Sequence, residues 1–99
     1  MTKKIVLRYP LLVDRATYVK VPADSQVLSV GAVVHNGVEV PSLWVLFDAG
    51  KPLVARKFRV FVTGEWFIDD PRPLKFVGTF IMHNNTLVFH VFEEIEKVE

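Results

Sequence analysis

Short runs of alternating or continuous apolar residues, each ended by a turn residue, make up almost the whole chain. No helical period of useful length interrupts them. The apolar residues are mostly Val, Ile, Leu and Phe, which fit a pleated, half-buried surface. This pattern is typical of an all-β protein. It predicts strands at residues 3–9, 17–21, 26–34, 38–40, 42–47, 56–63, 74–82 and 86–94.

Turn residues set the boundaries of these strands. Asn36-Gly37 is the strongest hairpin signal, because both residues accept the positive φ angles of a type I′ turn. His83-Asn84-Asn85 closes a second predicted hairpin. Pro41 ends the short strand that precedes it, and Gly31 predicts a bulge or a close backbone approach. Residues 53–55 fit a loop, the start of a strand or a helical turn equally well.

The number and spacing of the strands predict a small antiparallel sandwich or partly open barrel of about six to eight strands. We expect a single domain over residues 1–99, which is near the commonest size for an independent fold. Residues 43–47, 76–82 and 87–92 are apolar on both strand faces, and such strands need cover on both sides. With no long amphipathic helix available, the cover must come from loops, a ligand or another copy. We therefore predict a homo-oligomer.

The composition says more about the cellular compartment of the protein than about its function. A net charge of +1 neither demands nor excludes a nucleic-acid partner. Because the basic residues are scattered along the chain, we do not expect tight binding to nucleic acid. There is no cysteine, which fits a reducing cytosol. The basic start at residues 1–10 is too short for a signal peptide, and no apolar segment approaches the roughly 20 residues that cross a bilayer. We expect a soluble, cytoplasmic protein without membrane contact.

The histidines are the first residues to test for chemistry. His35 and His83 each precede an asparagine in a predicted turn, where a solvated side chain is expected. His90 lies in an apolar run, where it is either an acid-base group or a core or interface histidine with one satisfied hydrogen bond. No metal-ligand spacing, serine nucleophile motif or glycine phosphate loop is present, and Asp69-Asp70 is a weak cation signal. The sequence predicts no metal, no cofactor and no enzymatic activity.

The richest constellation is residues 63–70, an aromatic and then acidic segment that follows Arg56, Lys57 and Arg59. An aromatic pair beside basic and hydroxyl groups can stack a base and hold a phosphate. The alternative is that Trp66 and Phe67 plug an open end of the sandwich. Together with the histidine in the last strand, the candidate ligand-binding residues are Arg56, Arg59, Thr63, Trp66, Asp69 and His90.

Several short motifs carry a resemblance to a known family. They are Thr63-Gly64 followed by an aromatic residue and Asp69, then Gly78-Thr79, Phe89-His90-Val91-Phe92-Glu93, Val27-Leu28-Ser29-Val30 and Leu43-Trp44. With them the chain resembles an uncharacterised family of small bacteriophage and bacterial proteins. The resemblance implies an association with phages, and it supplies no activity and no site residues.

The sequence thus favours a non-enzymatic binding protein. We expect an accessory or counter-defence factor that binds a host protein or sequesters a small anionic ligand such as a nucleotide. One alternative is an assembly module whose apolar strand faces form a homo-oligomer. Another is a weak binder of single-stranded nucleic acid through Trp66, Phe67 and the basic strand. An aromatic groove lined with Arg or Lys favours a nucleotide, whereas a flat apolar patch favours a protein.

Overall fold

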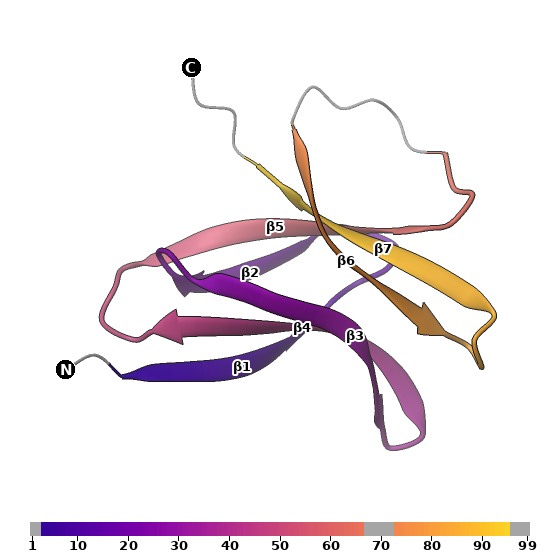
Figure 1. The fold of residues 1–99 in the computed structure, drawn as a ribbon, viewed down its shortest axis with the longest axis horizontal. Helices are drawn as coiled ribbons and strands as arrows, with labels where there is room; N and C mark the ends of the chain where they lie inside the picture. Colours follow the sequence, from indigo (N-terminus) through magenta and orange to yellow (C-terminus); the bar gives the residue numbers. More distant parts are fainter. Residues whose placement is uncertain (1–2, 67–72, 96–99) are drawn as a thin grey trace.

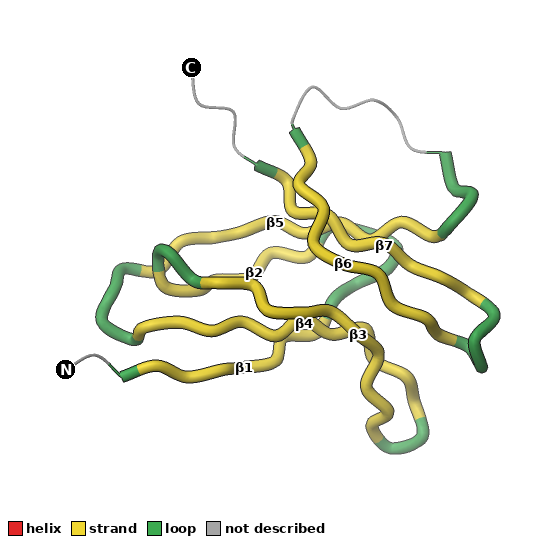
Figure 2. The backbone as a smooth tube through the Cα atoms, viewed as in Figure 1, coloured by secondary structure: helices red, strands yellow, loops and turns green. Residues whose placement is uncertain are grey.

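Seven antiparallel strands make up the fold (Figure 1). The computed structural model describes residues 3–66 and 73–95, and no helix occurs among them (Figure 2). The predicted all-β class is therefore confirmed, and no described segment is a helix long and apolar enough to cross a membrane. The strands are β1 (Lys4–Pro10), β2 (Thr17–Pro22), β3 (Gln26–His35), β4 (Val38–Asp48), β5 (Leu53–Val62), β6 (Leu74–Met82) and β7 (Leu87–Glu94).

The strands form two sheets that do not close into a barrel. A three-stranded sheet has the order β1-β4-β3 and a four-stranded sheet has the order β2-β5-β7-β6. The sheets approach most tightly between β3 and β6, where a Cβ on Gly78 would lie 2.7 Å from Val30 Cγ2. The radius of gyration is 14.4 Å, above the roughly 13 Å of a compact domain of this length. The fold is therefore a splayed sandwich, with β1 at its open margin (Figure 1).

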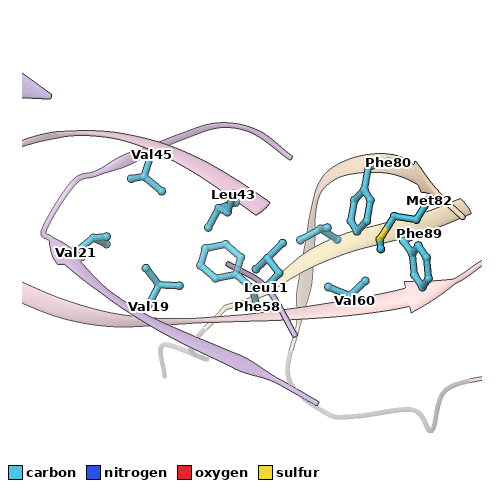
Figure 3. Packing of buried hydrophobic residues seen from close by; sticks show 11 residues of the cluster. Leu11, Val19, Val21, Leu43, Val45, Phe58, Val60, Phe80, Met82 and Phe89 are labelled. Atoms are coloured by element: carbon cyan, nitrogen blue, oxygen red, sulfur yellow. The ribbon is translucent and has the colours of Figure 1, made fainter. Parts of the chain in front are cut away.

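The hydrophobic core lies where the sheets overlap (Figure 3). Period-2 alternation places every second side chain of β4 and β5 between the sheets. Phe58 and Val60 of β5 are buried there. The buried cluster contains Leu11, Val19, Val21, Leu43, Val45, Phe58, Val60, Phe80, Met82, Phe89 and Val91.

Both predicted hairpin turns are confirmed. Asn36 and Gly37 have φ angles of 50° and 78°, as a type I′ turn requires. The turn at 83–85 also has positive φ throughout. Glu39 Oε1 accepts a hydrogen bond of 2.7 Å from the backbone N–H of His83, which ties the first hairpin to the second.

The prediction that Pro41 ends a strand is wrong, because β4 continues through it. The backbone N–H of Leu11 donates to the carbonyl of Pro41 at 2.8 Å, so Pro41 faces β1 where that ladder ends. Its missing donor therefore removes a single terminal bond. Residues 53–55, left open by the sequence, begin β5. The bulge of β3 lies between Val27 and Ser29 and not at Gly31, where a Cβ would make an ordinary contact of 3.4 Å with the Trp44 ring.

Candidate functional site

Strand alternation divides the candidate residues between two faces of the four-stranded sheet. Arg59 follows Phe58, whose side chain is buried in the core, so Arg59 projects from the outer face. Its cross-strand partner is Phe92, and the next outward residue, Phe61, lies opposite His90. Thr79 and Phe76 of β6 continue the same row. We call the outer surface formed by Arg59, Phe61, Thr63, Phe76, Thr79, His90 and Phe92 the Arg59 face.

His90 is held between two threonine hydroxyls. Thr63 Oγ1 lies 2.7 Å from Nε2, and Thr79 Oγ1 lies 3.0 Å from Nδ1. Thr63 also donates to the carbonyl of Val88 at 3.2 Å. Because a hydroxyl carries a single proton, Thr63 accepts from Nε2–H when it donates to the Val88 carbonyl. His90 therefore has both ring nitrogens satisfied, one more than the sequence predicted.

An aromatic cluster adjoins this histidine. Phe92 makes edge-to-face contacts with Phe61 and Phe76, at centroid distances of 5.8 and 5.6 Å. The Arg59 guanidinium lies 4.9 Å from the centroid of the Phe61 ring. Phe61 is only 5% exposed, whereas Phe76 is 57% exposed. The Arg59 face therefore combines a cation held over an aromatic ring with an accessible apolar surface.

Trp66 is the most exposed large hydrophobic residue of the described chain. The turn that precedes it is closed by two hydrogen bonds of 3.0 Å, from Glu65 N–H to the Val62 carbonyl and from Val62 N–H to Glu65 Oε1. Gly64 has a φ of 90°, which this turn requires. Trp66 is 97% exposed. Its ring therefore does not plug the core, so the plug interpretation is wrong for Trp66, and Phe67 lies outside the described residues.

Arg56 belongs to the opposite face and has a structural role. Its Nε and Nη2 donate to the two carboxylate oxygens of Glu93, each at 2.6 Å, and Nη1 donates to the Ser25 carbonyl at 2.6 Å. The hydrogen bonds to Glu93 raise the pKa of Arg56. Since Ser25 immediately precedes β3, these bonds connect the two sheets. Arg56 is thus engaged within the fold and separate from the Arg59 face.

Other basic side chains are paired as well. Lys57 lies 2.9 Å from Glu94, Lys51 lies 2.7 Å from Asp24, and Arg15 lies 3.1 Å from Asp14. Hydrogen bonds to these carboxylates raise the pKa of each cation. Within the described ranges, Arg59 has no carboxylate at ion-pair distance. It is therefore the basic group of the candidate set that remains available to a partner.

Two hollows flank these residues. The smaller, of about 130 Å³, lies beside the Arg59 face and is lined by Arg59, Phe61, Glu65 and the 13–16 segment. The larger is an open cleft of about 540 Å³ near the start of β3 and β6, and its lining includes Arg56, Glu93, Lys75 and Phe76. Small-molecule pockets usually measure roughly 300–1,000 Å³. The hollow beside Arg59 is smaller than that range.

The structure brings Arg59, Thr63 and His90 together on one face, with Trp66 three residues beyond Thr63. Asp69 lies outside the described residues. The sequence analysis missed Thr79, Phe76 and Phe92 as parts of this face. Counting from the predicted hairpin at 83–85 does not give these pairs, because the turn spans residues 83–86 and a bulge lies between Phe76 and Gly78; in the structure Thr79 lies opposite His90 and Phe76 opposite Phe92.

The arrangement around His90 shares one feature with a catalytic pair. A hydroxyl at 2.7 Å from an imidazole nitrogen is the spacing of a nucleophile and its base. However, the group on the other nitrogen is the uncharged Thr79, and no carboxylate of the described chain hydrogen-bonds to the ring. Over residues 3–66 and 73–95, no three His, Cys, Asp or Glu side chains are placed to hold a metal ion.

Comparison with known proteins gives a family and no activity. The chain belongs to the family described as domain of unknown function (DUF7352), whose model matches residues 1–99. This agrees with the resemblance to an uncharacterised family. The searches of curated proteins and of solved structures gave no significant match.

Proposed function

We propose that this protein is a non-enzymatic binding protein that recognises a protein partner through the Arg59 face and Trp66. The observation that carries the proposal is the 97% exposure of Trp66 beyond a closed turn. Burying such a ring in an interface removes a large apolar area from water and so stabilises the complex. Trp and Arg are among the residues that most often dominate binding energy. The resemblance to phage proteins supports a host protein as the partner, in an accessory or counter-defence role within the cytoplasm.

The shape of the surface favours a protein over a small molecule. The hollow beside Arg59 is only about 130 Å³, whereas Phe76 and Ile81 add exposed apolar area to the same outer face. Protein partners bind such surfaces through a few aromatic and arginine side chains surrounded by weaker contacts. Arg59 is also available to a partner, because its guanidinium lies over the Phe61 ring and forms no ion pair among the described residues.

Affinity capture with matched baits tests the proposal. Wild-type protein, Trp66→Ala, Arg59→Ala and the control Val38→Ala are immobilised and exposed to bacterial host lysate, and bound proteins are quantified by mass spectrometry. Val38 is 61% exposed at the tip of the first hairpin, away from the Arg59 face. We expect a partner retained by wild type and Val38→Ala and lost by both site variants.

We expect the Trp66→Ala substitution to weaken binding strongly and to leave the stability of the fold nearly unchanged. A hot-spot truncation costs about 2 kcal/mol or more of binding free energy, so the Kd of the captured partner should rise at least roughly tenfold. Trp66→Ala should leave the melting temperature nearly unchanged, because exposed substitutions usually stay within about 0.5 kcal/mol. Identical capture by all four baits would contradict the proposal.

A small anionic ligand is the second candidate, and the cleft of about 540 Å³ supports it. Lys75 lines this cleft beside Phe76, so a cation and an aromatic ring lie together there. Against it, Glu93 and Asp24 contribute two carboxylates to the same lining, and Arg56 is already bound to Glu93. Native mass spectrometry of the purified protein would reveal a retained nucleotide as an added mass.

A further inference from the structure

The outer face of the four-stranded sheet carries a row of cations on β2 and β5. Lys20 of β2 points outward, because both of its neighbours in the strand are buried. It lies opposite Ala55, two residues before Lys57 on β5, and Arg59 follows Lys57 on the same face. We call Lys20, Lys57 and Arg59 the cation row. The row extends the Arg59 face to the edge of the sheet at β2.

The cation row has an excess of positive charge. Glu94 is the only carboxylate that the four strands of this sheet direct to the outer face, and it is buried 2.9 Å from Lys57. Lys57 therefore already has a counterion. Lys20 and Arg59 have no carboxylate at ion-pair distance among the described residues. Two cations of the face thus remain uncompensated.

Lys20 and Arg59 are spaced to hold two side chains of one extended chain. Diagonal neighbours on adjacent strands lie about 7–8 Å apart, and same-face neighbours within a strand lie about 6.7 Å apart. The two steps from Lys20 through Lys57 to Arg59 therefore span roughly 14 Å. Residues i and i+4 of an extended chain point to the same side and are about 13 Å apart. A segment laid along β5 can thus reach both cations at once.

The aromatic rings beside the row favour a polypeptide over a nucleic acid. Proteins that bind single strands stack successive bases on aromatic rings. Here Lys57 Nζ lies 5.6 Å from the centroid of the Tyr18 ring, and the Arg59 guanidinium lies 4.9 Å from that of Phe61. The exposed rings Tyr18 and Phe76 are on β2 and β6, the two outermost strands, about 14 Å apart by strand spacing. That separation is too large for the bases of neighbouring nucleotides.

A partner that covers the row must bring acidic groups of its own. Burying a charge without a counterion costs free energy, so a wholly uncharged partner would desolvate Lys20 and Arg59 without compensation. A second copy of this chain is a poor source of acidic groups. The exposed carboxylates of the described residues each contact a group within their own chain, and these are Asp14, Asp24 and Glu65.

We propose that the partner of the Arg59 face contacts the cation row with an extended acidic segment, whose carboxylates four residues apart bind Lys20 and Arg59. This contact presupposes the proposed function and adds the charge and the conformation of the partner to it. Opposite charges across an interface steer association and fix its register. Lys20, which lies outside the Arg59 face, thereby becomes a binding residue.

Two synthetic peptides test the acidic segment. One has Glu at every second position with Tyr and Ser between, and the other has Gln in place of each Glu. Fluorescence anisotropy of labelled peptides measures their Kd for the full chain, and a labelled single-stranded oligonucleotide is the third probe. We expect the Glu peptide to bind roughly tenfold more tightly than the Gln peptide, and salt to weaken it. Equal binding of the peptides, no binding of the Glu peptide, or tighter binding of the oligonucleotide would refute the proposal.

Substitutions in the chain locate the contact. Lys20→Gln and Arg59→Gln should each weaken binding of the Glu peptide roughly threefold, and the double variant roughly tenfold, as exposed ion pairs do. The matched control Lys3→Gln/Lys4→Gln removes the same charge at the start of β1, on the other sheet, and should bind like wild type. Melting temperatures confirm that each variant is folded. An equal loss in the control would assign binding to net charge and overturn the cation row.

Lys20→Gln also separates this contact from the proposed function. For a partner that wild type captures, Lys20→Gln should raise the Kd roughly threefold at low salt. If Trp66→Ala loses that partner and Lys20→Gln binds it like wild type, the proposed function stands and the acidic segment is wrong. Unchanged capture by Trp66→Ala contradicts the proposed function instead, while the preference for the Glu peptide still decides whether the cation row binds acidic chains.

Discussion

At the scale of single residues, Gly78 decides how closely the sheets approach. A Cβ at this position would lie 2.7 Å from Val30 Cγ2, a distance that atoms in a packed core do not adopt. Only glycine therefore lets β6 come this close to β3. The bulge between Phe76 and Gly78 lies at the same point and re-aims the strand.

Gly78→Ala should consequently lower the free energy of unfolding by roughly 1–3 kcal/mol, the usual effect of overpacking. Chemical denaturation measures it, and Val30→Ala in the same chain should recover part of the loss. Gly50→Ala is the matched control, because a Cβ at Gly50 would meet no atom within 4 Å. If Gly78→Ala is as stable as Gly50→Ala, the close approach of β3 and β6 is wrong.

The contacts of Arg56 and Arg59 also explain why these two candidate residues have different roles. Arg56 and Arg59 stand three residues apart on one strand, and the period of two sends them to opposite faces. Arg56 meets Glu93 and Ser25 between the sheets, whereas Arg59 meets the Phe61 ring on the outside. Removing one partner of this partly buried, bidentate ion pair leaves the other charge without its partner. Arg56 is therefore a poor choice for testing ligand binding.

At the scale of elements, the hairpin between β3 and β4 depends on its turn. Gly37→Val places a β-branched residue at a φ of 78° and should destabilise the fold by roughly 1 kcal/mol or more. Asn36→Gly is the control, because glycine accepts the φ of 50° at its position without steric cost. The melting temperature of both variants provides the measurement. Equal melting temperatures for Gly37→Val and wild type would show that the turn contributes nothing.

At the scale of the whole molecule, ion pairing limits nucleic-acid binding. Arg15, Lys51, Arg56 and Lys57 all hold carboxylates, and the net charge is only +1. A net charge this small leaves little excess positive charge to release counterions from a phosphate backbone. We expect weak binding to single-stranded DNA that disappears between about 50 and 200 mM salt. Fluorescence anisotropy of a labelled oligonucleotide measures this, and tight binding that persists at high salt would reverse the ranking.

The sequence determined more of the fold than of the site. Apolar alternation and turn chemistry depend on local backbone preferences, so they located the strands and both hairpins. Pro41 was misread because the cost of its missing N–H depends on which neighbour the strand meets. Strand parity places Arg59 and Thr63 on one face, whereas their grouping with His90 depends on the pairing of β5 with β7, two strands that are not consecutive in the chain.

Tertiary structure alone decided the remaining features. Whether Trp66 is buried, whether Arg56 is available and whether β1 has cover depend on contacts between segments far apart in the chain. The sequence assigned the need for cover to residues 43–47, 76–82 and 87–92, and the structure adds Ile5, Val6 and Leu7 of β1, whose side chains are exposed. Local pattern specifies which residues seek burial, because hydrophobicity is a property of each side chain. The placement of the two sheets decides which of these hydrophobic residues are buried.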